Sequence, residues 1–374
     1  MAKKDDSRLM NELTTIFIPQ IKNIHESDKI DLIVIAGDLF DRILKFDEVG
    51  GKLVLNFMQE LIEWTNKNNI YFRIIQGTKT HDYNQLAVFR KAEVDNYNFK
   101  IYETVYNEKL TINEKEFNIL YLPEEYPEDM NDYYKEFFDV QENTYDMIFG
   151  HGMIDFVAFT GYEDDTEKIV KKAPVFVADD LIKITKGPIC FGHIHDYHEY
   201  KKQIYYSGSF SRYSHGDTMD KGYLYIKLNS EDTSEYEISF YVNELAPTYA
   251  TIDLDKIKYD NMEDLASLIN DSREEYDFIR IKSTNNNDSS IVRKVIENSP
   301  NIKVTLKNKN NEEQQVDSKW NFILDRELDT DDSIKKFIKI KYDKDIDISK
   351  IKAILNPEIE DIDDIIKNIY DKKK

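Results

Sequence analysis

The chain has 374 residues, of which 41% are hydrophobic and 33% charged, and its formal net charge is −22. This length predicts two or three domains, and the negative charge argues against charge-driven binding of nucleic acid by this chain alone. No apolar run approaches the roughly 18 residues of a membrane helix, and the N-terminus is not a signal peptide. The single Cys190 excludes an intramolecular disulfide, and we expect a cytoplasmic protein.

The first predicted elements alternate between helices and strands. Residues 6–25 carry apolar side chains at helical spacing, and residues 31–38 form a short buried strand that ends in a Gly-Asp turn. Residues 52–66 are predicted to be helical again, and residues 70–75 form a second strand. Strands separated by helices with one apolar face predict a parallel sheet in an α/β layer.

Further short apolar runs, each stopped by a proline or a glycine, predict more strands of the same kind at residues 117–122, 145–149 and 188–191. The runs that follow are expected to be antiparallel strands of a second sheet: residues 203–206, 222–228 and 237–242.

The character of the chain changes near residue 247. Residues 251–325 alternate short strands with helical stretches, with an Asn-rich loop at residues 284–288, and they predict a smaller α/β domain. From residue 329 onward the pattern predicts two helices, separated by Asn356-Pro357. The last of these has isoleucines at a spacing of three or four residues, so it has one apolar face.

One aspartate and four of the seven histidines lie just after predicted strands, most of them directly behind a glycine: Asp38, His81, His151, His193 and His195. In an α/β sheet such positions converge at the carboxyl edge of the strands, where ligands bind. Histidine and aspartate suit manganese, iron or zinc, and a set of this size can hold two ions.

Each motif also has a simpler interpretation. Gly37-Asp38 taken alone is most often a turn at the end of a strand, and His151 taken alone is equally well explained as a satisfied buried histidine. His193 and His195 are two residues apart and therefore share one side of an extended segment, which favours a metal. The ordered series carries more weight than any single motif.

The series consists of four motifs in chain order: Gly37-Asp38-Leu39-Phe40-Asp41, Gly77 to Thr80-His81-Asp82, Gly150-His151 and Gly192-His193-Ile194-His195. It resembles the calcineurin-like metallophosphoesterases, and among them most closely the SbcD-type nuclease subunits of bacteria and bacteriophages. The resemblance covers about residues 6–245, and it implies a four-layer α/β/β/α sandwich. On this basis residues 1–247 would be the metallophosphoesterase domain and residues 248–326 a DNA-capping-like α/β domain. Residues 327–374 would be C-terminal helices, for which binding to an ATPase and packing on their own domain are equally good explanations.

The resemblance also implies metal ligands. Asp38 would bridge two Mn²⁺ ions, His151 and His193 would bind one of them, and His195 would bind the other. Thr80 stands where the family has a liganding asparagine, and its hydroxyl is a poorer ligand than an amide carbonyl.

Three further residues receive roles at the reaction centre. His81 would act at the scissile phosphate, where it stabilises charge or protonates the leaving oxygen. Asp41 and Asp82 would orient the metal ligands.

One departure from the family pattern is serious. The family begins with a strand that ends in D-x-H, and residues 1–30 contain no such motif. Its absence removes two expected ligands and would leave neighbouring strands unpaired. A truncated start, a split gene and a degenerate homologue would each explain it, and we favour truncation of a working enzyme.

The resulting hypothesis is a Mn²⁺-dependent nuclease subunit that hydrolyses DNA phosphodiester bonds, as an exonuclease, an endonuclease or both. It would act with an SbcC-type coiled-coil ATPase in DNA recombination, repair or replication, and it could form a homodimer. The main alternative is a catalytically impaired homologue that serves as a binding module for the ATPase and DNA. A third hypothesis is a small-molecule phosphoesterase, which the long region after the catalytic domain disfavours.

Overall fold

A computed structural model of the chain describes residues 6–82, 84–158, 175–257, 262–283, 302–307 and 313–314. The chain has a mixed α/β fold and forms two compact units, Met1–Tyr249 and Ala250–Lys374. Within the described residues, no helix combines the length and hydrophobicity needed to cross a bilayer. The predicted helices of residues 327–374 and the predicted loop at residues 284–288 lie outside the described part of the chain.

The helix predicted at residues 6–25 is confirmed, with a π-helical segment in its middle. α1 (Asp6–Glu12) continues through η1 (Leu13–Phe17) into α2 (Ile18–Asp28). The wider turn comes directly before Pro19, which has no N–H to donate to a carbonyl of the preceding turn. The irregular segment therefore has a local chemical cause.

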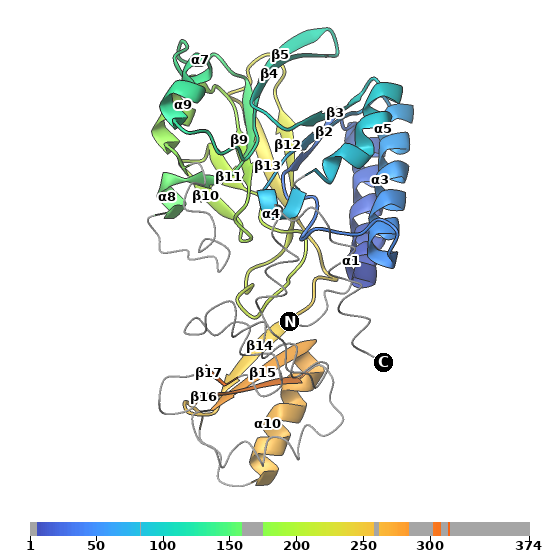
Figure 1. Cartoon of the computed structure of the whole chain (residues 1–374), viewed down its shortest axis with the longest axis vertical. Coiled ribbons are helices and arrows are strands. Elements are labelled where there is room, and N and C mark those ends of the chain that lie inside the picture. The colour runs from blue at the N-terminus through green and yellow to red at the C-terminus, as the bar shows by residue number, and fades with distance from the viewer. Residues whose placement is uncertain are drawn as a thin grey trace, which may run out of the picture. The chain divides into compact units, whose positions relative to one another are not determined.

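The first sheet of unit 1 has three parallel strands (Figure 1). Helices connect the strands and pack on one face of the sheet, where Phe72 and Ile74 meet Met58 and Leu61 in a buried core. The elements are, in chain order, β1 (Leu32–Ala36), α3 (Val49–Lys67), β2 (Tyr71–Ile75), α4 (Lys79–Asp82), η2 (Leu86–Phe89), α5 (Arg90–Asp95) and β3 (Phe99–Tyr102).

The second sheet has the strand order β10-β11-β9-β6-β5-β4. Its central pairs are parallel, and the hairpin β4–β5 and the pair β10–β11 are antiparallel. The strands are β4 (Tyr106–Ile112), β5 (Lys115–Leu122), β6 (Met147–His151), β9 (Ile189–Gly192), β10 (His198–Tyr200) and β11 (Ile204–Tyr206). Beside this sheet lie α6 (Met130–Tyr133), α7 (Lys135–Phe138), β7 (Met153–Ile154), α8 (Asp155–Ala158), β8 (Val175–Phe176) and α9 (Ala178–Ile184).

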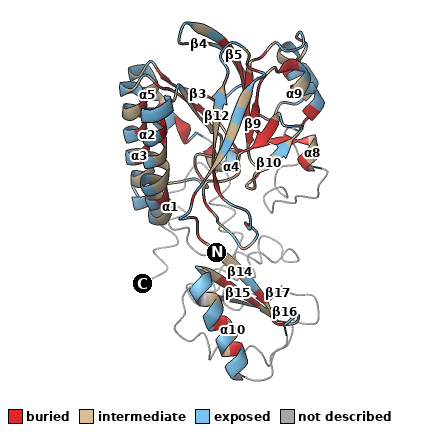
Figure 2. Cartoon of the chain, turned by 180° about the vertical axis from the view of Figure 1, so that it is seen from behind, coloured by how far each residue is buried: buried red, intermediate tan, exposed pale blue. Residues whose placement is uncertain are grey.

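The two sheets face each other, and each carries helices on its outer face (Figure 1). Alternate residues of one strand point to opposite sides. On β5, Ile119 and Tyr121 enter the core between the sheets, whereas Leu120 and Leu122 enter the core under α9. Figure 2 shows the buried residues gathered on these central strands and the exposed residues on the outer helices.

A hairpin of β12 (Gly222–Leu228) and β13 (Tyr236–Val242) forms a separate two-stranded sheet. Leu224 and Ile226 of β12 join the core between the larger sheets. Among the described residues β1 pairs with β2 alone, and all five residues of β1 are partly exposed. The other edge of β1 therefore has no strand partner in the described part of the chain.

Two predictions about the sheets were wrong. Residues 203–206 were expected in an antiparallel second sheet, but β11 pairs parallel with β9 in the six-stranded sheet. All three residues of β11 are buried, as expected for a strand with covered faces. The second error was to place Asp38, His81, His151, His193 and His195 at the edge of a single sheet, because β1 and β2 belong to one sheet and β6 and β9 to the other. Short strands that end in a glycine have similar sequences in both sheets. The local sequence therefore does not indicate which sheet a strand joins.

Unit 2 is a smaller α/β arrangement. Among its described residues four strands follow the order β14-β15-β16-β17, with β15 and β16 parallel and β16 and β17 antiparallel. Leu265 and Ile269 of the helix pack against Ile279 and Ile281 of β15. The elements are β14 (Tyr249–Asp253), α10 (Met262–Glu275), β15 (Phe278–Ser283), β16 (Ile302–Lys307) and β17 (Glu313–Gln314).

Candidate metal centre

Asp38 links the ends of β1 and β2 in the first sheet. It follows Gly37 directly after β1, and its backbone has a left-handed φ of 51°. Its Oδ1 accepts a hydrogen bond from the backbone N–H of Thr78 at 2.6 Å. Its Oδ2 lies 3.0 Å from Nδ1 of His81, which α4 carries just after β2. The predicted pair Asp38 and His81 is thus in contact.

His151 joins this group from the end of β6 in the second sheet. The residue is fully buried, and its Nδ1 lies 2.7 Å from the carbonyl oxygen of Ala36 on β1. Since a carbonyl only accepts hydrogen bonds, Nδ1 donates, and Nε2 is the nitrogen that faces the carboxylates. Nε2 lies 3.4 Å from Oδ2 of Asp38 and 3.5 Å from Oε2 of Glu124.

His193 completes the contact between strands of the second sheet. It follows Gly192 at the end of β9, and its backbone has an unusual φ of 93°. Its Nδ1 is buried, forms no hydrogen bond of normal geometry in the structure, and lies 3.3 Å from Oε2 of Glu124. The rings of His151 and His193 are perpendicular, with centroids 5.2 Å apart.

Glu124 was missed by the sequence analysis. It follows β5 and Pro123, and its side chain is only 1% exposed. Its backbone N–H donates to the carbonyl of Gln76, and the hydroxyl of Tyr126 donates to its Oε1. The signal was present, because β5 was predicted to end at Pro123. The other residues of the cluster mostly follow a glycine, whereas Glu124 follows a proline.

Glycines allow these groups to approach one another. A Cβ added to Gly37, which has φ +80°, would lie 2.1 Å from Nδ1 of His151. A Cβ added to Gly77 would lie 2.3 Å from Oδ1 of Asp38. Contacts this short are forbidden, so the packing of the site requires glycine at positions 37 and 77.

The electrostatics favour ionised carboxylates despite their burial. Burial alone would raise the pKa of Asp38, but His151 and His81 hold it well below its usual value. Burial would also raise the pKa of Glu124, but His193 and His151 lower it below its usual value. Burial alone would lower the pKa of His151, but the carboxylates of Asp38 and Glu124 raise it to about 9. The centre therefore keeps two ionised carboxylates next to imidazole rings in a largely buried place.

Asp82 and Asp41 differ in their roles. The carboxylate of Asp82 is fully buried and accepts hydrogen bonds from the backbone N–H groups of Phe40 at 3.1 Å and Gly77 at 2.8 Å. It thereby ties the loops after β1 and β2 together. Burial and the nearby Asp38 raise its pKa to about 6. Asp41 instead forms an ion pair with Arg42 at 2.7 Å.

Two further residues were predicted to be metal ligands, Thr80 and His195. Thr80 is exposed on α4, whereas the buried Thr78 places its hydroxyl 3.3 Å from both Asp38 and Glu124. The ring of His195 lies beside Tyr213 at 6.3 Å, and its backbone carbonyl accepts a hydrogen bond from Nζ of Lys221 at 2.6 Å. The structure brings together four of the predicted residues and adds Glu124.

The group fits a divalent metal. Ligand atoms of Glu124, His151 and His193 all lie within 4.8 Å of one another. Imidazole nitrogen and carboxylate oxygen suit zinc, manganese and iron, and a backbone carbonyl that fixes the second nitrogen of a histidine is typical of metal sites. Two of the surrounding residues, Asp38 and His193, have backbone conformations that cost about 1–3 kcal/mol each and often mark functional sites.

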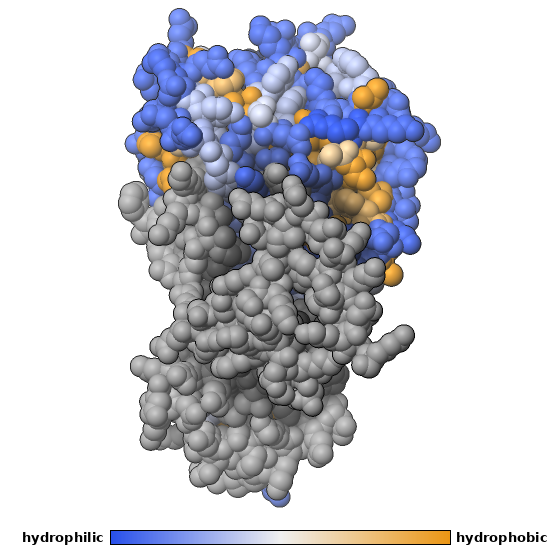
Figure 3. Space-filling view, in the orientation of Figure 1, coloured by the Kyte–Doolittle hydropathy of each residue, from blue (hydrophilic) through white to orange (hydrophobic). Residues whose placement is uncertain are grey.

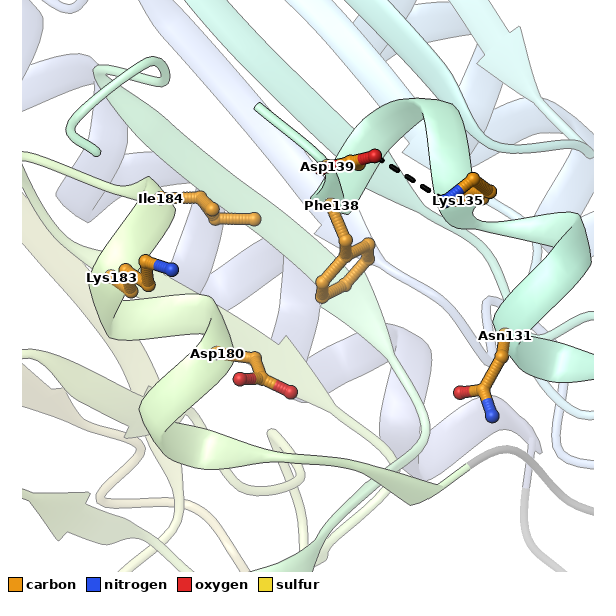
Figure 4. Close-up of a pocket in the computed structure, with 7 residues that line it drawn as sticks. All are labelled: Asn131, Lys135, Phe138, Asp139, Asp180, Lys183 and Ile184. Carbon is orange, nitrogen blue, oxygen red and sulfur yellow. Dashed lines mark hydrogen bonds and ion pairs between the residues drawn. The ribbon is translucent and has the colours of Figure 1, made fainter. Parts of the chain in front are cut away.

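A second hollow of the surface is unrelated to this centre. A pocket of about 280 Å³ lies between α7 and α9. Lys135 pairs with Asp139 on one side of the pocket, and Lys183 lies on the other side (Figure 4). None of its lining residues belongs to the cluster. The visible face of unit 1 is largely hydrophilic, with hydrophobic side chains in small groups (Figure 3).

Comparisons with known proteins identify no relative. No protein-family model matches the chain, and no curated protein sequence matches it either. The chemistry of the site therefore has to be inferred from its own geometry.

Proposed function

We propose that this chain is a divalent-metal-dependent phosphoesterase, with DNA phosphodiesters as the substrate class. The observation that carries the proposal is the convergence of Asp38, His81, Glu124, His151 and His193 where the strand ends of two facing sheets meet. The two sheets with outer helices are also what the metallophosphoesterase sandwich leads one to expect. When bound, a divalent ion supplies Lewis acidity to a phosphoryl oxygen and lowers the pKa of bound water.

His81 is the residue best placed to handle a proton. Its side chain is 21% exposed, unlike His151, so a substrate can reach the ring. Asp38 holds Nδ1 of His81 at 3.0 Å and so fixes the direction of the ring. A histidine held in this way can stabilise charge on a phosphoryl oxygen or give a proton to the leaving oxygen.

The proposal extends to a protein partner and to the number of metal ions. A charge of −22 favours a partner that supplies a positive surface for DNA, as an SbcC-type ATPase would. Two Mn²⁺ ions would need ligands beyond the group of Glu124, His151 and His193.

The test is hydrolysis of bis(p-nitrophenyl) phosphate, p-nitrophenyl phosphate and linear duplex DNA with Mn²⁺ or Zn²⁺. We expect the diester to be cleaved, and His81→Ala to lower the rate by about 10²–10⁴-fold. His198→Ala on β10 is the matched histidine control and should keep wild-type activity. If the metal-loaded wild type cleaves none of the three substrates, the enzymatic proposal fails and the binding-module alternative gains support.

A further inference from the structure

Glu124 holds the central position in the cluster. Its Oε2 lies 3.3 Å from Nδ1 of His193, 3.5 Å from Nε2 of His151 and 3.3 Å from Oγ1 of Thr78. Oε1 points the other way and accepts the hydroxyl hydrogen of Tyr126. One oxygen is thus fixed by the protein, while the other faces two imidazole nitrogens.

The histidines around Glu124 present imidazole nitrogens to buried carboxylates. Nδ1 of His151 is occupied by the carbonyl of Ala36, so Nε2 faces Asp38 at 3.4 Å and Glu124 at 3.5 Å. The hydroxyl of Thr78 also lies 3.4 Å from this nitrogen. Nδ1 of His193 is buried in a side chain only 10% exposed and forms no hydrogen bond of normal geometry. A buried nitrogen without a hydrogen bond is costly unless a ligand satisfies it.

We infer that Glu124, together with His151 and His193, binds a single divalent metal ion, with Asp38 as the fourth contributor. The inference rests on the proposed metal dependence and adds a ligand that the family resemblance did not suggest. It also changes the expected stoichiometry, because only one group of this kind is present among the described residues. Two nitrogen and two carboxylate ligands favour Zn²⁺ or Mn²⁺ over Ca²⁺ or Mg²⁺, which prefer oxygen alone.

The experiment measures binding rather than turnover. The full chain is stripped with EDTA and titrated with Zn²⁺ or Mn²⁺ by calorimetry, and the metal content after desalting is measured by mass spectrometry. We expect one ion per chain. Loss of a residue that only hydrogen-bonds to a metal ligand weakens metal binding by roughly 10–100-fold. Glu124→Gln should weaken it by more, because Glu124 would be a ligand itself.

Glu125→Gln is the matched control. Glu125 is the adjacent residue of the same type, and it accepts hydrogen bonds from Val105 and Tyr133 outside the cluster. It should bind metal with wild-type affinity. Melting curves in EDTA show whether each variant folds. If Glu124→Gln does not fold, Glu124→Asp replaces it. The shorter aspartate side chain moves the carboxylate oxygen away from the histidines and should also weaken metal binding.

Several outcomes overturn the inference: two ions per wild-type chain, no ion, or wild-type affinity in a folded Glu124 variant. The results also separate this inference from the proposed function. If Glu124 binds one ion but the protein hydrolyses no phosphoester, the metal site is supported and the phosphoesterase function is rejected. Hydrolysis with a Glu124→Gln variant that binds metal normally would do the reverse.

Discussion

Two buried polar groups lie between the facing sheets of unit 1, and they differ in how completely the protein satisfies them. Arg73 of β2 donates to both carboxylate oxygens of Glu108 on β4, at 2.8 and 2.9 Å, and to the carbonyls of Asn98 and Phe72. Lys100 adds a further contact to Glu108 at 3.1 Å. We call this ion pair closed, because each of its charged groups is hydrogen-bonded to groups of the protein.

The cluster around Glu124 is built from similar charges but is not closed in this way. Its distances from imidazole nitrogen to carboxylate oxygen run from 3.0 Å between His81 and Asp38 to 3.5 Å between His151 and Glu124. Nδ1 of His193 is left without a hydrogen bond of normal geometry. Burial alone therefore does not indicate function, whereas burial with unused ligand atoms does.

The largest expected effect concerns the closed pair. Arg73→Met leaves Glu108 buried with Lys100 as its remaining cation, and it should lower the free energy of unfolding by about 3–5 kcal/mol. Equilibrium urea denaturation measures this loss, and saturating Zn²⁺ should not restore it selectively. Arg90→Met is the control, because Arg90 pairs with Glu93 and Glu103 but is 41% exposed, and its loss should stay below about 1 kcal/mol. Equal losses in both variants would contradict the comparison.

The pH dependence of stability gives a second test of the closed pair. Burial opposes the shift, but Arg73 and Lys100 lower the pKa of Glu108 below its ordinary value of 4.5. A lowered carboxyl pKa stabilises the fold above pH 4.5, and this contribution disappears as the pH falls through the folded-state value. Glu108→Gln should therefore lose less stability on acidification than the wild type. Identical acid limbs of the two stability curves would show that Glu108 is not linked to folding.

Gly37→Ala tests whether the packing around His151 is needed for metal binding. The new Cβ would meet Nδ1 of His151 at 2.1 Å in a backbone with φ +80°, so strain and overpacking should cost about 1–3 kcal/mol. Displacement of His151 should also abolish the rise in melting temperature that Zn²⁺ gives the wild type. Gly216→Ala is the control, since its Cβ would have no neighbour nearer than 3.5 Å. An unchanged Zn²⁺ response in Gly37→Ala would show that His151 is not a ligand.

The sequence predicted this centre better than it predicted the sheets around it. Asp38, His81, His151 and His193 were found because each lies just behind a strand, and that position depends only on local pattern. Which sheet a strand joins depends on pairing with distant residues, so the placement of β11 could not be obtained locally. Thr80 was chosen by its offset from His81, but the helical turn of α4 exposes it and leaves Thr78 facing Asp38.

The smallest expected effect tests how Glu124 is held. Tyr126→Phe removes the hydroxyl that donates to Oε1 of Glu124, which should cost about 1 kcal/mol of stability and weaken Zn²⁺ binding by about tenfold. Tyr133→Phe is the matched control, because Tyr133 makes the same kind of hydrogen bond to Glu125 outside the cluster. Isothermal titration of both variants decides the question. Wild-type affinity in Tyr126→Phe would mean that the histidines alone orient the carboxylate, and the centre would then be more nearly closed than the distances indicate.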